Sequence, residues 1–193
     1  LQSESLAFSL THGKFLAKGS LQFLSHANNF EYINTTLMGH PLVTNDYGKI
    51  KSQNQQLDMG YKLSPHTNYS FSYWASQQDR EVPQNMTTPF SDAKQYDRAK
   101  RALLSLNHKV NHFSIVLKQA YLQEDFRYTE DLKNINSHYL AESYISDADV
   151  KLIKGNYLFN LGGAFRANNL TNNNYVSMGK QERSLAAFSA LQY

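Results

Sequence analysis

The sequence predicts an all-β fold: an antiparallel, up-and-down meander of about nine strands that forms part of a large transmembrane β-barrel. Three observations predict this fold class. Apolar and polar side chains alternate with a period of two residues along the whole chain, which is typical of strands with two different faces. Short and long connections alternate between the strands, and one face of the strands is too polar for a dry protein core.

The clearest alternation lies in residues 68–76, where Tyr69, Phe71, Tyr73 and Ala75 fall on one face of an extended chain. The same period recurs along the chain, and only residues 90–106 also fit a helix; a strand is the preferred interpretation there. The predicted strands lie near residues 3–12, 15–27, 48–63, 68–78, 95–108, 112–125, 137–146, 155–167 and 182–193.

The connections between these strands are of two kinds. Those expected to be short are residues 13–14, 64–67, 109–111 and 147–154, and those expected to be long are residues 28–47, 77–94, 126–136 and 168–181. Antiparallel hairpins give this alternation when all tight turns lie at one end of the sheet. Outer-membrane barrels are built in this way, with short periplasmic turns and long extracellular loops.

One face of the strands is apolar next to the short turns and becomes polar toward the long loops. Phe113, Ile115 and Leu117, for example, share a face with Gln119 and Gln123. An apolar band of fixed height gives this pattern, and ~9–11 residues of a strand suffice to cross lipid. The residues expected to face lipid include Phe8, Phe23, Leu57, Met59, Tyr61, Phe71, Leu104, Ile115, Leu117, Phe159 and Leu161.

The opposite face is polar and is expected to line a wet or plugged lumen, because each unpaired polar group that is buried costs roughly 1–3 kcal/mol. In residues 137–146 the two faces differ less. Tyr139, Ala141, Ser143 and Ile145 are assigned to the lipid face, since the other choice places Glu142 in hydrocarbon. The residues expected to face the lumen include Asn54, Gln56, Asp58, Ser70, Ser72 and Gly162.

Composition excludes several classes of function. The chain has no cysteine, so it offers no disulfide, no thiolate metal site and no cysteine nucleophile. Its net charge of +3 is spread along the sequence, which argues against a nucleic-acid partner. The sequence contains no catalytic motif, no glycine-rich phosphate-binding loop and no helix with Glu and His metal ligands. We therefore expect no catalytic residues, no metal site, no cofactor and no enzyme activity.

The two ends of the sequence indicate a segment of a longer barrel. Up-and-down barrels close with an even number of strands, whereas the predicted number is odd. The first residues, LQSESLAFSL, lack the organisation of a signal peptide. The first and last predicted strands also begin or end next to the chain termini.

Three segments resemble the TonB-dependent outer-membrane receptors: NNFEYINTT at 28–36, DREVP at 79–83 and AKQYDRAKRALLSL at 93–106. The first is similar to the start of an extracellular loop, the second to the opening of another loop, and the third to the return of the chain to the membrane. Two departures from the family pattern are Glu81 and the short loop at 84–92. The resemblance extends loosely over residues 1–193.

This resemblance implies that residues 1–193 are part of a 22-stranded barrel domain, without the plug and the TonB box of an intact receptor. It also implies location in the bacterial outer membrane and contact with its lipid. The function it implies is TonB-dependent uptake, through the plug of the intact protein, of a scarce nutrient such as an iron–siderophore, cobalamin or a haem-like compound. The alternative is a soluble β-rich ligand-binding or adhesion module, which would need a dry core.

The residues expected to bind such a ligand lie on the extracellular loops. Phe30, Tyr32 and Tyr96 offer aromatic surface for stacking, and Arg80 offers donors to an anionic chelate. Phe90 is a further aromatic loop residue. An ion pair with a neighbouring acid, which would fix the base of the loop, is an alternative role for Arg80. His108 and His112 flank a predicted turn and are expected to be exposed rather than to bind metal.

Overall fold

The computed structural model describes residues 1–83, 91–172 and 176–193. Nearly all of this part of the chain is strand, and Phe90 lies outside it. The elements are β1 (Gln2–His12), β2 (Phe15–His26), β3 (Phe30–Ile33), β4 (Leu42–Asn45), β5 (Ile50–Ser64), β6 (Thr67–Glu81), β7 (Lys94–Val110), β8 (Phe113–Glu130), η1 (Asp131–Lys133), β9 (Ile135–Lys154), β10 (Tyr157–Asn172) and β11 (Val176–Gln192).

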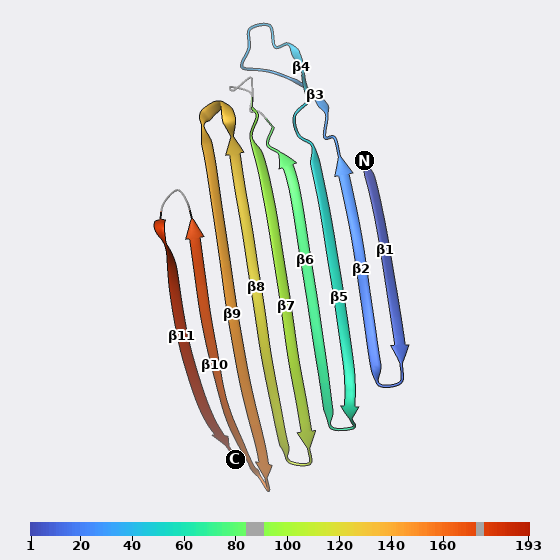
Figure 1. Cartoon of the computed structure of the whole chain (residues 1–193), viewed down its shortest axis with the longest axis vertical. Coiled ribbons are helices and arrows are strands. Elements are labelled where there is room, and N and C mark those ends of the chain that lie inside the picture. Colours follow the sequence, from blue (N-terminus) through green and yellow to red (C-terminus); the bar gives the residue numbers. More distant parts are fainter. Residues whose placement is uncertain (84–90, 173–175) are drawn as a thin grey trace.

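The main sheet has nine strands in the order β1-β2-β5-β6-β7-β8-β9-β10-β11, and every pair in it is antiparallel (Figure 1). Each strand of the main sheet therefore pairs with the strands of that sheet that precede and follow it in the chain, as the sequence predicts. The strands β3 and β4 form a separate two-stranded sheet within the connection from β2 to β5. The segment that also fits a helix, residues 90–106, contributes β7 to the sheet.

Two-residue turns close one end of the sheet, shown at the bottom of Figure 1. They are residues 13–14, 65–66, 111–112 and 155–156. Gly13, Asn111 and Gly155 have positive φ angles, which the commonest two-residue hairpin turns use and which glycine and asparagine tolerate. The turn at 65–66 has no positive φ angle, and the register of β5 shifts beside it. The expected turn at 147–154 is wrong, because those residues continue β9 and the turn follows at Gly155.

Two of the four connections expected to be long are short. Between β8 and β9 only residues 131–134 intervene, and between β10 and β11 only residues 173–175, which lie outside the described residues. The prediction ended these strands where apolar alternation stopped. The hydrogen-bond ladder between backbones does not depend on that alternation, so the strands extend through polar sequence. The connections at 28–47 and 82–93 remain longer.

The register confirms the two predicted faces. Directly paired residues of antiparallel strands project to the same side of a sheet. Phe71 pairs with Met59 and Leu104, and Met59 pairs with Ala17. All eleven residues expected to face lipid are connected in this way on one face, called here the outward face, and the six expected lumen residues lie on the other, the inward face.

The assignment of β9 is wrong. Tyr144 pairs with Tyr121 and Glu142 pairs with Gln123, so both project to the outward face. Tyr139, Ala141, Ser143 and Ile145 consequently project inward. The argument against this orientation was that it places Glu142 in hydrocarbon. Glu142 instead lies beyond the apolar part of the strand, and the Tyr121 hydroxyl donates a hydrogen bond of 2.8 Å to its carboxylate.

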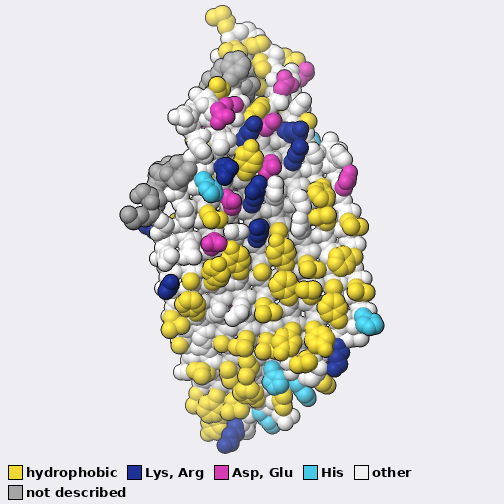
Figure 2. Space-filling model, viewed as in Figure 1, with side chains coloured by type: hydrophobic (Ala, Val, Ile, Leu, Met, Phe, Trp, Pro, Cys, Tyr) yellow, Lys and Arg dark blue, Asp and Glu magenta, His cyan; other side chains and the backbone are white. Residues whose placement is uncertain are grey.

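The apolar side chains have no protein layer over them. Among the described residues only Ala17 and Ala93 are buried apolar residues, whereas Phe8 is 55% exposed and Leu161 is 61% exposed. Figure 2 shows hydrophobic side chains gathered over the lower part of the sheet and charged side chains over its upper part. The longest helical element among the described residues is a single 3-10 turn, and no helix there is long and apolar enough to cross a membrane.

Candidate functional site

Phe30 and Tyr32 lie on β3, in the small sheet at the loop end of the molecule (Figure 1). Residues two apart in a strand share a face, and their ring centroids are 6.0 Å apart with an angle of 50° between the rings. Phe30 is 47% exposed. The two aromatic residues thus form one pair, on a segment that the sequence predicted only as a loop.

Hydrogen bonds tie the connection that carries this pair to the main sheet. One carboxylate oxygen of Glu81 accepts from the backbone N–H groups of Gly48 and Lys49, at 3.2 and 3.0 Å. The Glu81 N–H donates to the Lys49 carbonyl at 2.9 Å. Burial raises the pKa of Tyr47 beside this junction, and the charges of Glu81 and Asp92 act in the same direction. Glu81 therefore fixes the base of the loop.

Arg80 projects from β6 to the inward face, where it pairs with Gln95 of β7. Its Nε atom lies 3.9 Å from a carboxylate oxygen of Asp97, and the Gln95 amide donates to both oxygens of the same carboxylate at 3.0 Å. Both charged side chains are about two fifths exposed. Such a pair is weak in water, so Arg80 keeps donors that a ligand can use.

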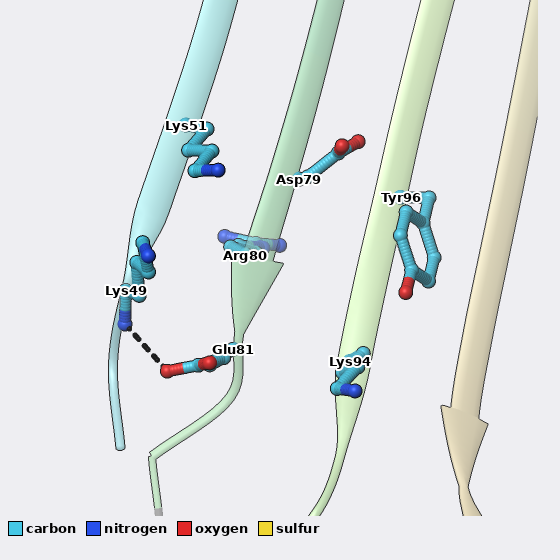
Figure 3. A pocket seen from close by; sticks show the side chains of 7 residues that line it. All are labelled: Lys49, Lys51, Asp79, Arg80, Glu81, Lys94 and Tyr96. Carbon is cyan, nitrogen blue, oxygen red and sulfur yellow. Dashed lines mark hydrogen bonds between the residues drawn. The ribbon is translucent and has the colours of Figure 1, made fainter. Parts of the chain in front are cut away.

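Tyr96 lies on the other face of the sheet from Arg80. It pairs with Asp79 and Arg127, which project outward. Figure 3 shows Lys51, Asp79 and Tyr96 on adjacent strands around a shallow pocket of about 200 Å³, with Arg80 behind its ribbon. Arg80 and Tyr96 both line this pocket, although their side chains project to opposite faces of the sheet. Phe30 and Tyr32 lie on β3 and do not line it, so the four residues do not form one site.

A second inward cluster lies further from the loops. The Arg101 guanidinium is 4.9 Å from the centroid of the Trp74 ring, which is within the range of a cation–π contact. The same guanidinium lies 3.4 Å from a carboxylate oxygen of Glu124. This contact places an aromatic ring and two opposite charges side by side on the inward face of β6, β7 and β8.

A hollow that the sequence did not predict lies on the inward face of β8 to β11. Its volume is about 980 Å³. The Ser143 hydroxyl donates to the Asn168 side-chain oxygen at 2.8 Å, and the Asn168 amide lies 3.4 Å from Glu182. The side chains that point into it from the inward face include Leu122, Tyr139, Ala141, Ser143, Ile145, Arg166, Asn168, Leu170, Lys180 and Glu182.

Two cations of this hollow are available to a ligand. Arg166 and Lys180 have no acidic partner within ion-pair distance in the part of the chain that the structure describes, and both are exposed. The sequence did not predict this hollow because Tyr139 and Ile145 were assigned to the outward face. The alternation that places Arg166, Asn168 and Leu170 on one face could have indicated it.

His108 and His112 do not form a paired site. His108 Nδ1 lies 2.8 Å from the Thr67 hydroxyl, and the His112 carbonyl accepts from the Ile153 N–H. No group of three or more His, Asp or Glu side chains suited to a metal ion occurs within residues 1–83, 91–172 and 176–193.

Comparisons with known proteins find likeness in structure alone. No family model matches the sequence, and no curated protein matches it either. The ferric citrate transporter FecA, solved without ligand, matches over 98% of this chain with a TM-score of 0.54 and 12% identity. BauA, the ferric preacinetobactin receptor from Acinetobacter baumannii, matches over 98% of this chain with a TM-score of 0.54 and 11% identity.

The chain spans 33% of the length of the first of these proteins and 37% of the second. Identity this low supports a shared fold and nothing finer. The matched element is the whole nine-stranded meander, with its tight turns at one end and its loops at the other. Over its described residues, the chain has the fold of part of the barrel of the TonB-dependent receptors FecA and BauA.

Proposed function

We propose that this chain is part of an outer-membrane receptor that takes up a scarce nutrient, bound as a small chelate. One observation carries the proposal: a single sheet has an uncovered apolar band on its outward face and polar side chains on its inward face. Lipid on one side and water on the other give each face a matching solvent. A soluble module would need a second protein layer over the apolar band.

The chemistry of the inward face and the loops suggests an anionic ligand. Arg166 and Lys180 supply cations in a hollow of about 980 Å³, which lies within the usual size range of small-molecule sites, about 300–1,000 Å³. Arg80 adds a third cation on the same face of the sheet. Phe30 and Tyr32 supply stacking surface near the loop end. A ferric siderophore chelate fits this combination best, ahead of cobalamin or a haem-like compound.

The two structural neighbours named above are a ferric citrate transporter and a ferric preacinetobactin receptor. Their names support iron chelates as the ligand class. Under this proposal the chain contributes binding surface and a wall of the barrel, and it performs no covalent chemistry. Energy would reach the intact protein through TonB and a plug.

The test is uptake of radioactive ferric siderophore by cells whose only receptor for it is the intact protein. Phe30→Ala/Tyr32→Ala should reduce uptake at limiting concentration roughly tenfold, because losing about 1.4 kcal/mol of stacking changes affinity tenfold. Arg166→Gln/Lys180→Gln should do the same for an anionic chelate and much less for a neutral one. Cell fractionation should place each variant in the outer membrane in normal amount.

The matched control is His108→Ala/His112→Ala, which changes two aromatic side chains at the turn end of the sheet. Uptake should be unchanged in this variant. If His108→Ala/His112→Ala abolished uptake and Phe30→Ala/Tyr32→Ala did not, the ligand would bind at the turn end of the sheet, which contradicts the proposal. Recovery of the protein from the soluble fraction would overturn the receptor assignment itself.

A further inference from the structure

The inward face of the sheet is not polar everywhere. On β5 and β6 it presents mostly amide and hydroxyl side chains, such as those of Asn54, Gln56 and Ser72. On β8, β9 and β10, by contrast, apolar side chains gather on this face and line the hollow described above. This apolar patch consists of Leu122, Tyr139, Ala141, Ile145 and Leu170.

The side chains of the apolar patch lie next to one another and cover each other only in part. Leu170 pairs with Ala141, and Leu122 pairs with Ser143, which lies between Ala141 and Ile145 on β9. All five apolar residues of the patch are half-buried. Apolar surface in contact with water raises the free energy in proportion to its area. The patch therefore favours a ligand that brings apolar surface of its own.

Cations border the apolar patch on the side of β10 and β11. Arg166 pairs with Ile145, and Lys180 pairs with Leu170. The rows of these two cations are four residues of β10 apart, which is roughly 13 Å along the strand. The hollow thus combines apolar side chains, most of them on β8 and β9, with cations on the two strands that follow.

Glu182 limits the charge of a ligand that the hollow can take. It pairs with Asn168 in the row between the two cations. Asn168 accepts from the Ser143 hydroxyl at 2.8 Å, and its amide lies 3.4 Å from Glu182. Glu142 projects to the outward face, so the side chains that point into the hollow carry two positive charges and one negative charge. A ligand with a single anionic group matches this net charge, whereas a compact polyanion would be repelled by Glu182.

We propose that this hollow binds an amphiphilic chelate, which carries one anionic group and a hydrocarbon arm. The arm covers the apolar patch, and the anionic group accepts hydrogen bonds from Arg166 or Lys180. The inference rests on the proposed function and narrows its ligand class. A purely polar chelate would leave the apolar patch in contact with water, and a neutral hydrocarbon would leave both cations without a partner.

Equilibrium binding of two synthetic ferric hydroxamate chelates to cells that make the intact protein tests the proposal. Both chelates carry radioactive iron and one carboxylate, and they differ only in having an octanoyl or an acetyl arm. Binding to cells without the protein is subtracted. The unchanged protein should bind the octanoyl form at least tenfold more tightly, because each buried methylene group strengthens binding roughly fourfold.

The variant Leu122→Asn/Ile145→Thr makes two side chains of the apolar patch polar and nearly keeps their size. It should bind the octanoyl and acetyl forms about equally tightly, with its affinity for the acetyl form unchanged. The matched control is Leu103→Asn/Val116→Thr, which makes the same changes on the inward face at positions that do not line the hollow. This control should keep the preference for the octanoyl form.

The variant Arg166→Gln/Lys180→Gln separates recognition of the charge from recognition of the arm. It should weaken binding of both chelates by the same factor and keep the ratio between them. Unchanged affinity for both chelates in this variant would overturn the role of the two cations.

Three further results would overturn the proposal. Equal affinity of the unchanged protein for the two chelates, or binding of neither, would mean that another part of the intact protein covers the apolar patch. A preference that survives in Leu122→Asn/Ile145→Thr, or that the control loses as well, would place the arm outside the hollow. Failure of the receptor proposal looks different, because the protein would then be recovered from the soluble fraction.

Discussion

Three successive residues of β8 have different neighbours on the two faces of the sheet. Leu117 projects outward between Leu106 and Ala148, whereas its neighbour Val116 projects inward between Asn107 and Asp149. Lys118, on the other side, projects inward beside Ser105 and Asp147. Within the described residues, packing against protein does not explain the difference, because no second layer covers either face there. Under the proposed function, the solvent on each side, rather than a shared core, selects the residues of this sheet.

The largest expected effect comes from placing a charge on the apolar band. Leu117→Arg should lower the free energy of unfolding by roughly 2–4 kcal/mol in phospholipid vesicles if the residue lies near mid-bilayer. Val116→Arg should have little effect, because the new charge would meet water and Asp149 on the inward face. Urea titration of the protein refolded into vesicles measures both. An equal loss of free energy of unfolding in the two variants would show that the two faces do not meet different solvents.

A smaller effect is expected where a phenylalanine ring covers a glycine on the next strand. A Cβ atom at Gly162, on the inward face, would lie 2.3 Å from the Phe188 ring and 3.1 Å from the Ala148 carbonyl. At Gly19, on the outward face, the close atoms all belong to the Phe8 ring. Gly162→Ala should therefore cost about 1–3 kcal/mol, as overpacking does.

Gly19→Ala is the matched variant and should cost less, because the exposed Phe8 ring can swing away into lipid. The same urea titration compares the two. If Gly19→Ala lowered the free energy of unfolding more than Gly162→Ala, the Phe8 ring would not be free to move away. Lipid would then restrict that ring more than the backbone restricts the space at Gly162.

The smallest effect tests the corrected orientation of β9. Tyr121→Phe removes the hydrogen bond from the tyrosine hydroxyl to Glu142. We expect a loss of about 1 kcal/mol, the usual net value of such a bond. Tyr139→Phe, on the inward face, should cost nothing measurable. If the Tyr139 variant were the destabilised one, the register of β9 against β8 would be wrong.

The sequence alone identified the all-β class, the meander and the two faces of most strands. Phe71 could be assigned because it is flanked by Ser70 and Ser72, so the period of two is unambiguous there. The sequence also singled out Arg80 and the pair Phe30 and Tyr32. It missed the strands β3 and β4, because four-residue strands within a polar loop carry almost no periodic signal.

Only the tertiary structure decided how far the strands run and which way β9 faces. Periodicity is a local property, and it reports the environment of a side chain, so it disappears where both faces become polar. The backbone ladder is a property of two strands: Tyr144 faces outward because it pairs with Tyr121. This pairing turned Tyr139 and Ile145 inward and brought them to Arg166 and Lys180 in one hollow. It also separated Arg80 from Tyr96, since adjacent positions along paired strands project to opposite sides of the sheet.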